Sequence, residues 1–318
     1  MSNNALAFVF PGQGSQSVGM LAKLAEASPV IRATFDEASR VLRYDLWELC
    51  QQGPVEKLNS TEHTQPAMLA AGIATWRLWQ ERNGATPAVV TGHSLGEFSA
   101  LVAAGAIDFE TCVDLVRFRG QVMQEAVPAG SGAMAALLGL DDPDAIAACT
   151  EAAAAGGVVE AVNFNSQGQV VIAGDRTAVL RAIDIAKAKG AKRAVELAVS
   201  VPAHSSLMRA AGARLGEKLA NTEIRAPRIK FVSAVDGDAH SDPDDLRALL
   251  VRQLSSPVRW THTVASITGD GGIRQIVECG PGQVLVSLVK RIERRRDTQV
   301  FALEDIDSFS AASSAVAA

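Results

Sequence analysis

Gly92-His93-Ser94-Leu95-Gly96 separates a short apolar run, residues 88–91, from a helix-like run over residues 97–104. This order predicts a strand, a sharp turn and a helix, which together form a nucleophile elbow. The flanking glycines of such an elbow let a serine hydroxyl stand exposed at the top of a sheet. The same pentapeptide pattern also occurs in plain glycine-rich turns, so this stretch alone leaves both interpretations open. On the first interpretation, Ser94 is the candidate nucleophile.

Strand and helix patterns alternate on both sides of this turn. Residues 6–10 are expected to form a buried strand that leads into the glycine-rich loop 11–16. A helix is expected to start at Thr64, with Pro66 in its first turn, and to continue past Trp79. The alternation resumes after residue 228 with strands at 229–235, 273–278 and 300–303 and a capped helix at 242–254. This rhythm predicts an α/β fold with a mainly parallel sheet covered on both faces.

A different rhythm occupies the middle of the chain. We expect a strand ending at Leu140, a helix over 143–154, strands at 158–162 and 169–173, a helix over 176–189 and a strand over 194–201. The order β-α-β-β-α-β is typical of ferredoxin-like domains. The sequence therefore predicts an insert at residues 129–201 within a parent domain made of residues 1–128 and 202–307. The Ser/Ala-rich stretch 308–318 is expected to be a disordered tail.

Composition excludes several classes of protein. Thirty basic and thirty-five acidic residues give a formal charge of −5, which offers no global field for nucleic acid. Neither a secretion signal nor a membrane-spanning run is recognisable, so we expect a cytoplasmic protein. The four cysteines are widely spaced and no histidine stands at ligand spacing, so we expect reduced core thiols and no metal.

A serine hydroxyl needs a base within hydrogen-bond reach to act as a nucleophile. Among the five histidines, His204 is best placed, because it follows the last strand of the insert and precedes a helix, where functional groups gather. The alternative is an ordinary helix-cap histidine. His93 adjoins Ser94, but neighbours in a tight elbow point apart, so we interpret it as structural.

Arg119 lies on the apolar stripe of the helix that Asp108 opens, whereas Arg117 stands three residues after Asp114 and indicates a surface ion pair. A buried arginine needs an anion, and a carboxylate suits its planar fork. Either Arg119 pairs with an internal acidic residue, or the carboxylate arrives with a substrate. An oxyanion formed during acyl transfer would also need amide donors, one expected from Leu95 and another from the loop at Gln13.

Seven motifs recur in this chain in the order of a known family. They are 10-FPGQGSQ-16, 92-GHSLGE-97, Arg119-Gly120, 162-VNFNS-166, 201-VPAH-204, Gln253-Leu254 and 280-GPG-282. Together they resemble the bacterial malonyl-CoA:acyl-carrier-protein transacylases of type II fatty-acid synthesis, over about residues 5–305. The resemblance implies an α/β-hydrolase-like large domain with a ferredoxin-like insert.

The resemblance also implies roles for individual residues. Ser94, activated by His204, takes the malonyl group from coenzyme A and yields it to the phosphopantetheine thiol of acyl carrier protein, in a ping-pong reaction without a bound cofactor. The backbone carbonyl at Gln253 orients the base, the amides of Gln13 and Leu95 form the oxyanion hole, and Arg119 holds the malonyl carboxylate. Asn163 and Asn165 line the thioester channel. A small residue, Ala203, precedes the histidine and leaves branched substrates open, although Leu95 favours unbranched malonyl.

The expected partners are an acidic carrier protein and a coenzyme A thioester, with no nucleic acid and no membrane, and the chain is expected to be a monomer. Two basic runs, residues 187–193 and 290–296, are either solvated faces or contacts for the carrier. Three other functions stay open. They are malonyl loading in polyketide synthesis, a serine hydrolase that passes the acyl group to water, and a scaffold that holds a carrier protein without chemistry.

Overall fold

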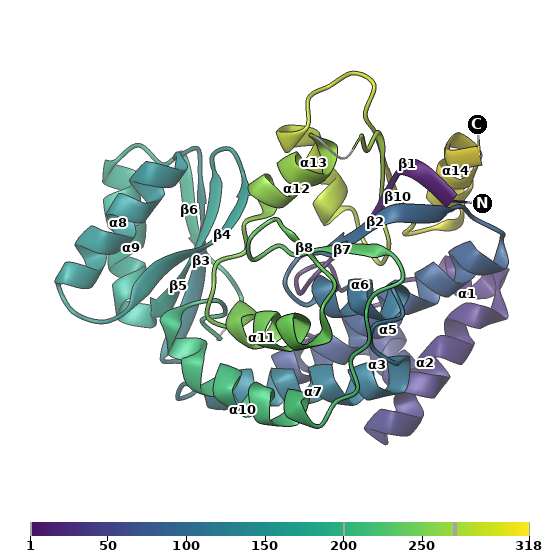
Figure 1. Ribbon diagram of the computed structural model, residues 1–318. Coiled ribbons are helices and arrows are strands. Elements are labelled where there is room, and N and C mark those ends of the chain that lie inside the picture. The colour runs from purple at the N-terminus through teal and green to yellow at the C-terminus, as the bar shows by residue number, and fades with distance from the viewer. Residues whose placement is uncertain (1, 200, 270–271, 318) are drawn as a thin grey trace.

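The computed structural model describes residues 2–199, 201–269 and 272–317. Each of its two units is built around one sheet (Figure 1). The strands of the six-stranded sheet, in the order β10-β9-β1-β2-β7-β8, are β1 Ser2–Phe10, β2 Thr86–Gly92, β7 Lys230–Val232, β8 Ala239–His240, β9 Gln275–Glu278 and β10 Gln299–Ala302. Every pairing is parallel except that of β7 with β8. The predicted parallel sheet is therefore confirmed, with one short antiparallel edge strand.

Helices surround this sheet and position the chemistry-bearing residues. They are α1 Ala22–Ala27, α2 Pro29–Leu42, α3 Leu46–Gln52, α4 Val55–Leu58, α5 Thr61–Glu81, α6 Gly96–Ala103, α7 Phe109–Glu125, α10 Arg209–Ala220 after the 3₁₀ turn η1 Ser206–Met208, α11 Pro243–Gln253, α12 Trp260–Thr268, α13 Val284–Ile292 and α14 Ile306–Ala317.

Strand β1 shows why both faces of the sheet are covered. Leu6, Phe8 and Phe10 point into one apolar cluster and Ala7 and Val9 into another, and all five are fully buried. Successive side chains of a strand point to opposite faces, so a strand segment that is buried throughout, as residues 6–10 are, needs helices on both sides. Helices α5 and α6 contact one face, and α12 and α13 contribute to the cluster on the other.

The smaller sheet lies within the predicted insert. Its strands, in the order β4-β5-β3-β6, are β3 Gly132–Leu138, β4 Val159–Ser166, β5 Gln169–Asp175 and β6 Arg193–Glu196, and its helices are α8 Asp142–Ala154 and α9 Arg176–Ala188. All the pairings are antiparallel. The element order and this strand order make the unit ferredoxin-like, as predicted. The domain boundaries at residues 129 and 201 stay predictions.

Strand β4 joins the insert to the larger unit by backbone hydrogen bonds. The Val258 N–H donates to the Val162 carbonyl (2.8 Å), and the Phe164 N–H donates to the Val258 carbonyl (2.9 Å). Asn163 and Val258 thus form a parallel bridge. The two units are therefore held in register just before α12.

Three sequence predictions are corrected. Strand β6 ends at Glu196 rather than residue 201, because the Val199 N–H turns back to the Leu197 carbonyl (2.8 Å); Ser200 lies outside the described residues. Helix α5 begins at Thr61, not at Thr64. The tail predicted to be disordered forms α14, because its spaced apolar residues bury themselves, with Phe309 edge-on to Trp79 (5.9 Å between ring centroids).

The predicted elbow is present between β2 and α6. Ser94 adopts φ 52°, in the left-handed region. A side chain at Gly92 would overlap the backbone of Gly96, and one at Gly96 would overlap the Phe10 carbonyl of β1. The two glycines are therefore required by close backbone approach, which lets the turn pass over the neighbouring strand.

We expect Gly96→Ala to lower the free energy of unfolding by about 2 kcal/mol or more, because the Phe10 carbonyl is backbone and cannot move aside. Chemical denaturation monitored by circular dichroism measures the loss. Gly216→Ala in α10 is the matched control, since its new methyl group would meet only the Val251 side chain (3.2 Å). Equal stability of the two variants would contradict this account of the elbow.

Candidate active site

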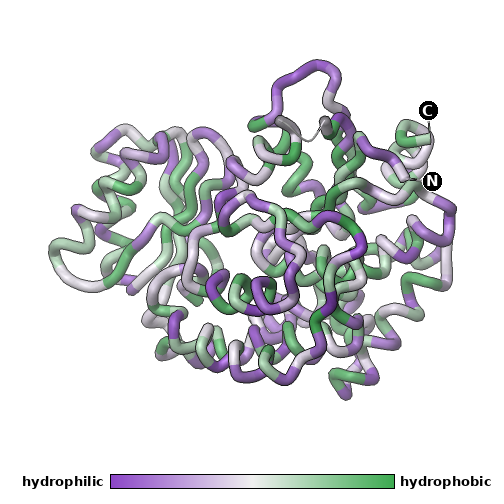
Figure 2. The backbone as a smooth tube through the Cα atoms, in the orientation of Figure 1, coloured by the Kyte–Doolittle hydropathy of each residue, from purple (hydrophilic) through white to green (hydrophobic). Residues whose placement is uncertain are grey.

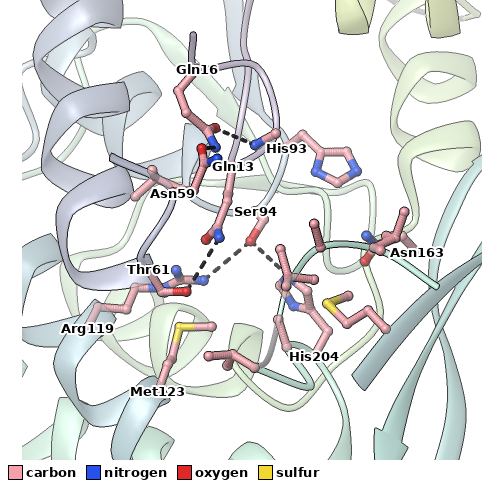
Figure 3. A pocket seen from close by; sticks show the side chains of 18 residues that line it. Gln13, Gln16, Asn59, Thr61, His93, Ser94, Arg119, Met123, Asn163 and His204 are labelled. Atoms are coloured by element: carbon pink, nitrogen blue, oxygen red, sulfur yellow. Dashed lines mark hydrogen bonds between the residues drawn. The ribbon is translucent and has the colours of Figure 1, made fainter. Parts of the chain in front are cut away.

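Ser94 stands at the floor of a cavity of about 330 Å³ between the two units. Figure 3 shows its hydroxyl between His204 and Arg119. The Oγ atom lies 2.7 Å from Nε2 of His204 and 3.4 Å from an Nη atom of Arg119. The elbow thus brings the predicted nucleophile to the predicted base across 110 residues of sequence.

His204 is held so that it can accept the serine proton. Its Nδ1 atom lies 2.8 Å from the Gln253 carbonyl, which only accepts hydrogen bonds. Nδ1 therefore carries the ring proton, and Nε2 is left as the acceptor for the Ser94 hydroxyl. His204 also has a left-handed backbone, φ 67°, and its N–H donates to the Leu254 carbonyl (3.0 Å). The end of α11 thus fixes both the position and the tautomer of the base.

Burial and positive charge keep His204 neutral. The side chain is only 3% exposed, and burial together with the nearby Arg119 guanidinium lowers the pKa of His204 to about 3. The uncharged imidazole is the form that accepts a proton. The base is therefore ready at neutral pH without an acidic third residue.

Arg119 is 1% exposed, as its place on the apolar stripe of α7 predicts, and Arg117 forms the expected ion pair with Asp114 (2.8 Å). Within the described residues, the Arg119 guanidinium pairs directly with no carboxylate. Its Nη atoms instead donate to the Oε1 atoms of Gln65 (2.8 Å) and Gln253 (3.0 Å).

The Nε atom of Arg119 is buried without a hydrogen-bond partner among the described residues. Burial lowers the pKa of Arg119 to about 10, which still leaves the guanidinium charged at neutral pH. A buried cation with an unused N–H beside a nucleophile is suited to an anionic group on an incoming molecule.

The two amides predicted for an oxyanion hole both belong to residues at the cavity. Gln13 and Leu95 line it, and neither backbone N–H donates to another group within the described part of the chain. The amides on either side of the turn are engaged, since the Gly96 N–H donates to the His93 carbonyl (2.9 Å) and the His93 N–H to the Phe10 carbonyl (3.0 Å). Two unused amides therefore belong to residues that flank the nucleophile from different loops.

The two asparagines predicted for a channel have different surroundings. Asn163 lines the cavity, and its Oδ1 is buried without a partner among the described residues. Asn165 differs from the prediction, because its Oδ1 is bonded to Nε2 of His93 (2.8 Å) and the residue is not among the described ones that line the cavity. His93 also lines the cavity, and its expected structural function stays a prediction.

The rest of the cavity wall includes residues that sequence reasoning missed. Thr61 and Met123 line it from α5 and α7, and Met134 and residues 197–199 line it from the insert. Gln65 and the side chain of Gln253 were also missed, because amides carry no charge pattern. A signal existed for Glu97, the one carboxylate in an apolar helix, which is fully buried in α6.

The described residues contain no group of three or more His, Cys, Asp or Glu that could hold a metal ion. Within the same ranges, no helix is both long and apolar enough to span a bilayer.

Comparisons with known proteins agree on one family. The family model of the acyl transferase domain matches residues 7–304. The malonyl CoA-acyl carrier protein transacylase of Escherichia coli K12 is 54% identical over 286 residues, which cover 90% of this chain and 92% of that protein.

Solved structures give the same result. The malonyl-CoA:acyl carrier protein transacylase of Xanthomonas oryzae pv. oryzae superposes with a TM-score of 0.96 at 50% identity, covering 99% of both chains. A malonyl-transacylase solved in complex with its type II PKS acyl-carrier protein superposes with a TM-score of 0.94 at 53% identity, covering 98% of this chain and 99% of that one.

We expect a fluorophosphonate probe to label Ser94 at nearly the same rate, within about threefold, at pH 5 and pH 8. The pKa of His204 is lowered to about 3, so its proton-accepting form persists through this range. For a histidine with the ordinary pKa of about 6.5, the fraction of neutral imidazole would fall about thirtyfold between pH 8 and pH 5. Intact-protein mass against time measures the rate.

The control for this experiment is His204→Ala, which we expect to lower the labelling rate about a hundredfold at both pH values. Circular dichroism checks that the chain stays folded at pH 5. A thirtyfold fall in the wild-type rate between pH 8 and pH 5 would contradict the neutral-base assignment.

Proposed function

The chain belongs to the acyl transferase family, with the malonyl-CoA:acyl-carrier-protein transacylases as its relatives, and on that basis we propose that it transfers malonyl groups. The donor is malonyl-CoA, the acceptor is the phosphopantetheine thiol of an acyl carrier protein, and the intermediate is a malonyl ester on Ser94. The observation that carries this proposal is the Ser94 hydroxyl between a neutral histidine and a buried arginine that has no direct carboxylate partner among the described residues.

In the first half-reaction, Nε2 of His204 takes the Ser94 proton as Oγ attacks the thioester carbonyl carbon. The oxyanion that forms accepts hydrogen bonds from the Gln13 and Leu95 amides, each worth roughly 3 kcal/mol of barrier. When the intermediate collapses, the carbon–sulfur bond breaks and the proton on Nε2 passes to the coenzyme A thiolate. The malonyl group remains as an ester on Ser94.

The second half-reaction reverses these roles. His204 takes a proton from the carrier thiol, the thiolate attacks the malonyl ester, and the serine oxygen leaves with the proton from Nε2. Because one base serves both directions, a ping-pong reaction needs no further acid and no bound cofactor. The Gln253 carbonyl is sufficient to orient the imidazole (2.8 Å).

Arg119 selects the acyl group in this proposal. The malonyl carboxylate accepts hydrogen bonds from the buried guanidinium, whose planar fork matches a carboxylate. An acetyl group leaves the cation without this partner, and leaving a buried polar group unpaired is costly. Ala203 lines the cavity and is small, so size alone does not reject a branched malonyl.

A second function, loading of carrier proteins in polyketide synthesis, is favoured by one comparison. The related malonyl-transacylase solved with a type II PKS acyl-carrier protein is 53% identical, close to the 54% of the Escherichia coli enzyme. The chemistry at Ser94 is the same for both carriers.

We further propose that the chain acts as a monomer in the cytoplasm. All four cysteines are buried and unpaired, as suits a reducing compartment.

Two basic runs form the proposed contact with the acidic carrier. Lys192 packs against Gly139, whose N–H donates to the Gly168 carbonyl (2.8 Å), and Arg291 donates to the Gln169 side chain (2.7 Å). Both runs therefore reach the same end of the insert, at the turn between β4 and β5. Figure 2 shows the loop after α13, which belongs to the second run, as strongly hydrophilic.

We expect mixing with malonyl-CoA, without a carrier, to add one malonyl mass to the wild-type chain and none to Ser94→Ala. Acetyl-CoA should give much slower acylation, because Arg119 then lacks its partner. Arg119→Ala should lose malonyl acylation at least about a hundredfold and keep or gain acetyl acylation. Intact-protein mass spectrometry measures all three chains.

Release of free malonate without an adduct would instead indicate a hydrolase. Detection of neither an adduct nor free malonate would favour the scaffold that holds a carrier protein without chemistry. A normal malonyl preference in Arg119→Ala would show that the arginine is not the carboxylate site.

We expect the triple variant Lys189→Glu, Lys192→Glu, Arg193→Glu to raise the KM for the carrier about tenfold and to leave acylation by malonyl-CoA unchanged. Reversed charge repels an acidic partner without reaching the cavity. The matched control reverses three exposed charges elsewhere, Lys23→Glu, Arg40→Glu and Arg225→Glu. Steady-state transfer to the carrier at low salt is the measurement, and unchanged KM in the first triple variant would exclude this surface.

A further inference from the structure

Glu97 is a buried acidic residue that the proposed mechanism does not use. It lies three residues after Ser94 in α6 and is fully inaccessible to solvent. Its Oε1 accepts hydrogen bonds from the Ser233 hydroxyl (2.7 Å) and the Ala234 N–H (2.6 Å). The other oxygen, Oε2, accepts from the side-chain amide of Gln253. A buried carboxylate with this many dedicated partners is costly to keep and calls for an explanation.

The partners of Glu97 all act as donors. The Ala234 backbone N–H and the Gln253 Nε2 can only donate. The Ser233 hydroxyl already accepts from the Val235 N–H (3.0 Å), which directs the hydroxyl proton to Glu97. The surroundings therefore match an ionised carboxylate, which accepts hydrogen bonds and donates none.

The side-chain amide of Gln253 is held at both ends. Its Nε2 donates to Glu97 and to the Ser94 carbonyl (3.0 Å), and its Oε1 accepts from Arg119 (3.0 Å). Turning the amide over would set N–H groups against the guanidinium and a carbonyl oxygen against two acceptors. Glu97 and the Ser94 carbonyl thus permit one orientation, which is the one that offers an acceptor to Arg119.

We propose that Glu97 is a positioning residue for substrate selection, which acts through the Gln253 amide to hold the Arg119 guanidinium at the Ser94 hydroxyl. This inference rests on the proposed function of Arg119 as the site of the malonyl carboxylate. The amide between them keeps the negative charge of Glu97 near the buried guanidinium but away from its unused Nε–H. A carboxylate in direct contact would occupy the fork that the substrate needs.

The test compares acylation of Ser94 by malonyl-CoA and by acetyl-CoA in Glu97→Gln, at pH 8. Burial raises the pKa of Glu97 to about 7, so its carboxylate is mostly ionised at this pH. Acetyl transfer needs only Ser94, His204 and the oxyanion donors, whereas malonyl transfer also needs Arg119 in place. We expect malonyl acylation to fall about tenfold and acetyl acylation to change less than about twofold.

Glu278→Gln is the matched control. Glu278 is also fully buried, and its carboxylate accepts from the Leu285 N–H (3.1 Å) and the Val286 N–H (2.7 Å) at the start of α13, outside the cavity. We expect this variant to lose stability and to keep the wild-type ratio of malonyl to acetyl acylation. A fall in the ratio in both variants would show a general effect of burying an extra amide and would overturn the proposal.

Gln253→Met provides a second route to the same answer if Glu97→Gln does not fold. It removes the amide but keeps the backbone carbonyl that orients His204, so the ratio should fall as in Glu97→Gln. The double variant should be no worse than either single variant, because both remove the same link. A wild-type ratio in Gln253→Met would overturn the proposal.

The remaining outcomes are also decisive. If malonyl and acetyl acylation fall together in Glu97→Gln, the residue is merely structural. If the ratio rises, Glu97 acts by repelling the substrate carboxylate, and the positioning role is excluded. The proposed function has a separate test, because its failure would appear as a wild-type chain without a malonyl adduct or without preference over acetyl.

Discussion

The close passage of the β2–α6 turn over β1 is the constraint on which the rest of the site depends. Ser94 can stand in the left-handed region only because Gly92 and Gly96 let the backbones approach without side chains between them. His204, its hydrogen-bond partner, is also left-handed. Both ends of the proton transfer are therefore strained, and packing elsewhere holds them in place. Cores on both faces of the sheet supply that packing.

The cavity combines a permanent positive charge with a base that stays neutral. Arg119 and His204 both lie within hydrogen-bond reach of one serine oxygen, and each influences the other, because a buried guanidinium makes protonation of a nearby imidazole unfavourable. This arrangement favours negative charge on the substrate and on Ser94 as its proton leaves. In the proposed reaction His204 is charged only transiently, which is consistent with a backbone carbonyl as the partner of its imidazole.

Sequence reasoning succeeded where a local pattern has one physical meaning. The alternating strands and the stripe that buries Arg119 follow from spacing, and the order of elements identified the ferredoxin-like unit. The elbow pattern by itself also fits a plain glycine-rich turn, and the rest of the chain was needed to favour the nucleophile. The position of His204 between the last strand of the insert and a helix already favoured it as the base, and the resemblance added Gln253 as the residue that orients it. The side chains of Gln65 and Gln253 were missed, because an amide can serve at a surface or in a buried network equally well. The terminal helix was missed because a few apolar residues in a Ser/Ala-rich stretch find their partners only in the folded chain, as Phe309 finds Trp79.

The bridge between Asn163 and Val258 has a consequence for how such proteins diversify. A recombination event that exchanged the insert alone would cut the chain at its two connections but would also replace one side of this backbone ladder. Val258 lies five residues after Gln253, so a mismatch there would disturb the segment that orients the base. An exchanged insert therefore has to keep the backbone path of β4 at residues 162–164, so that its N–H and carbonyl groups still meet those of Val258.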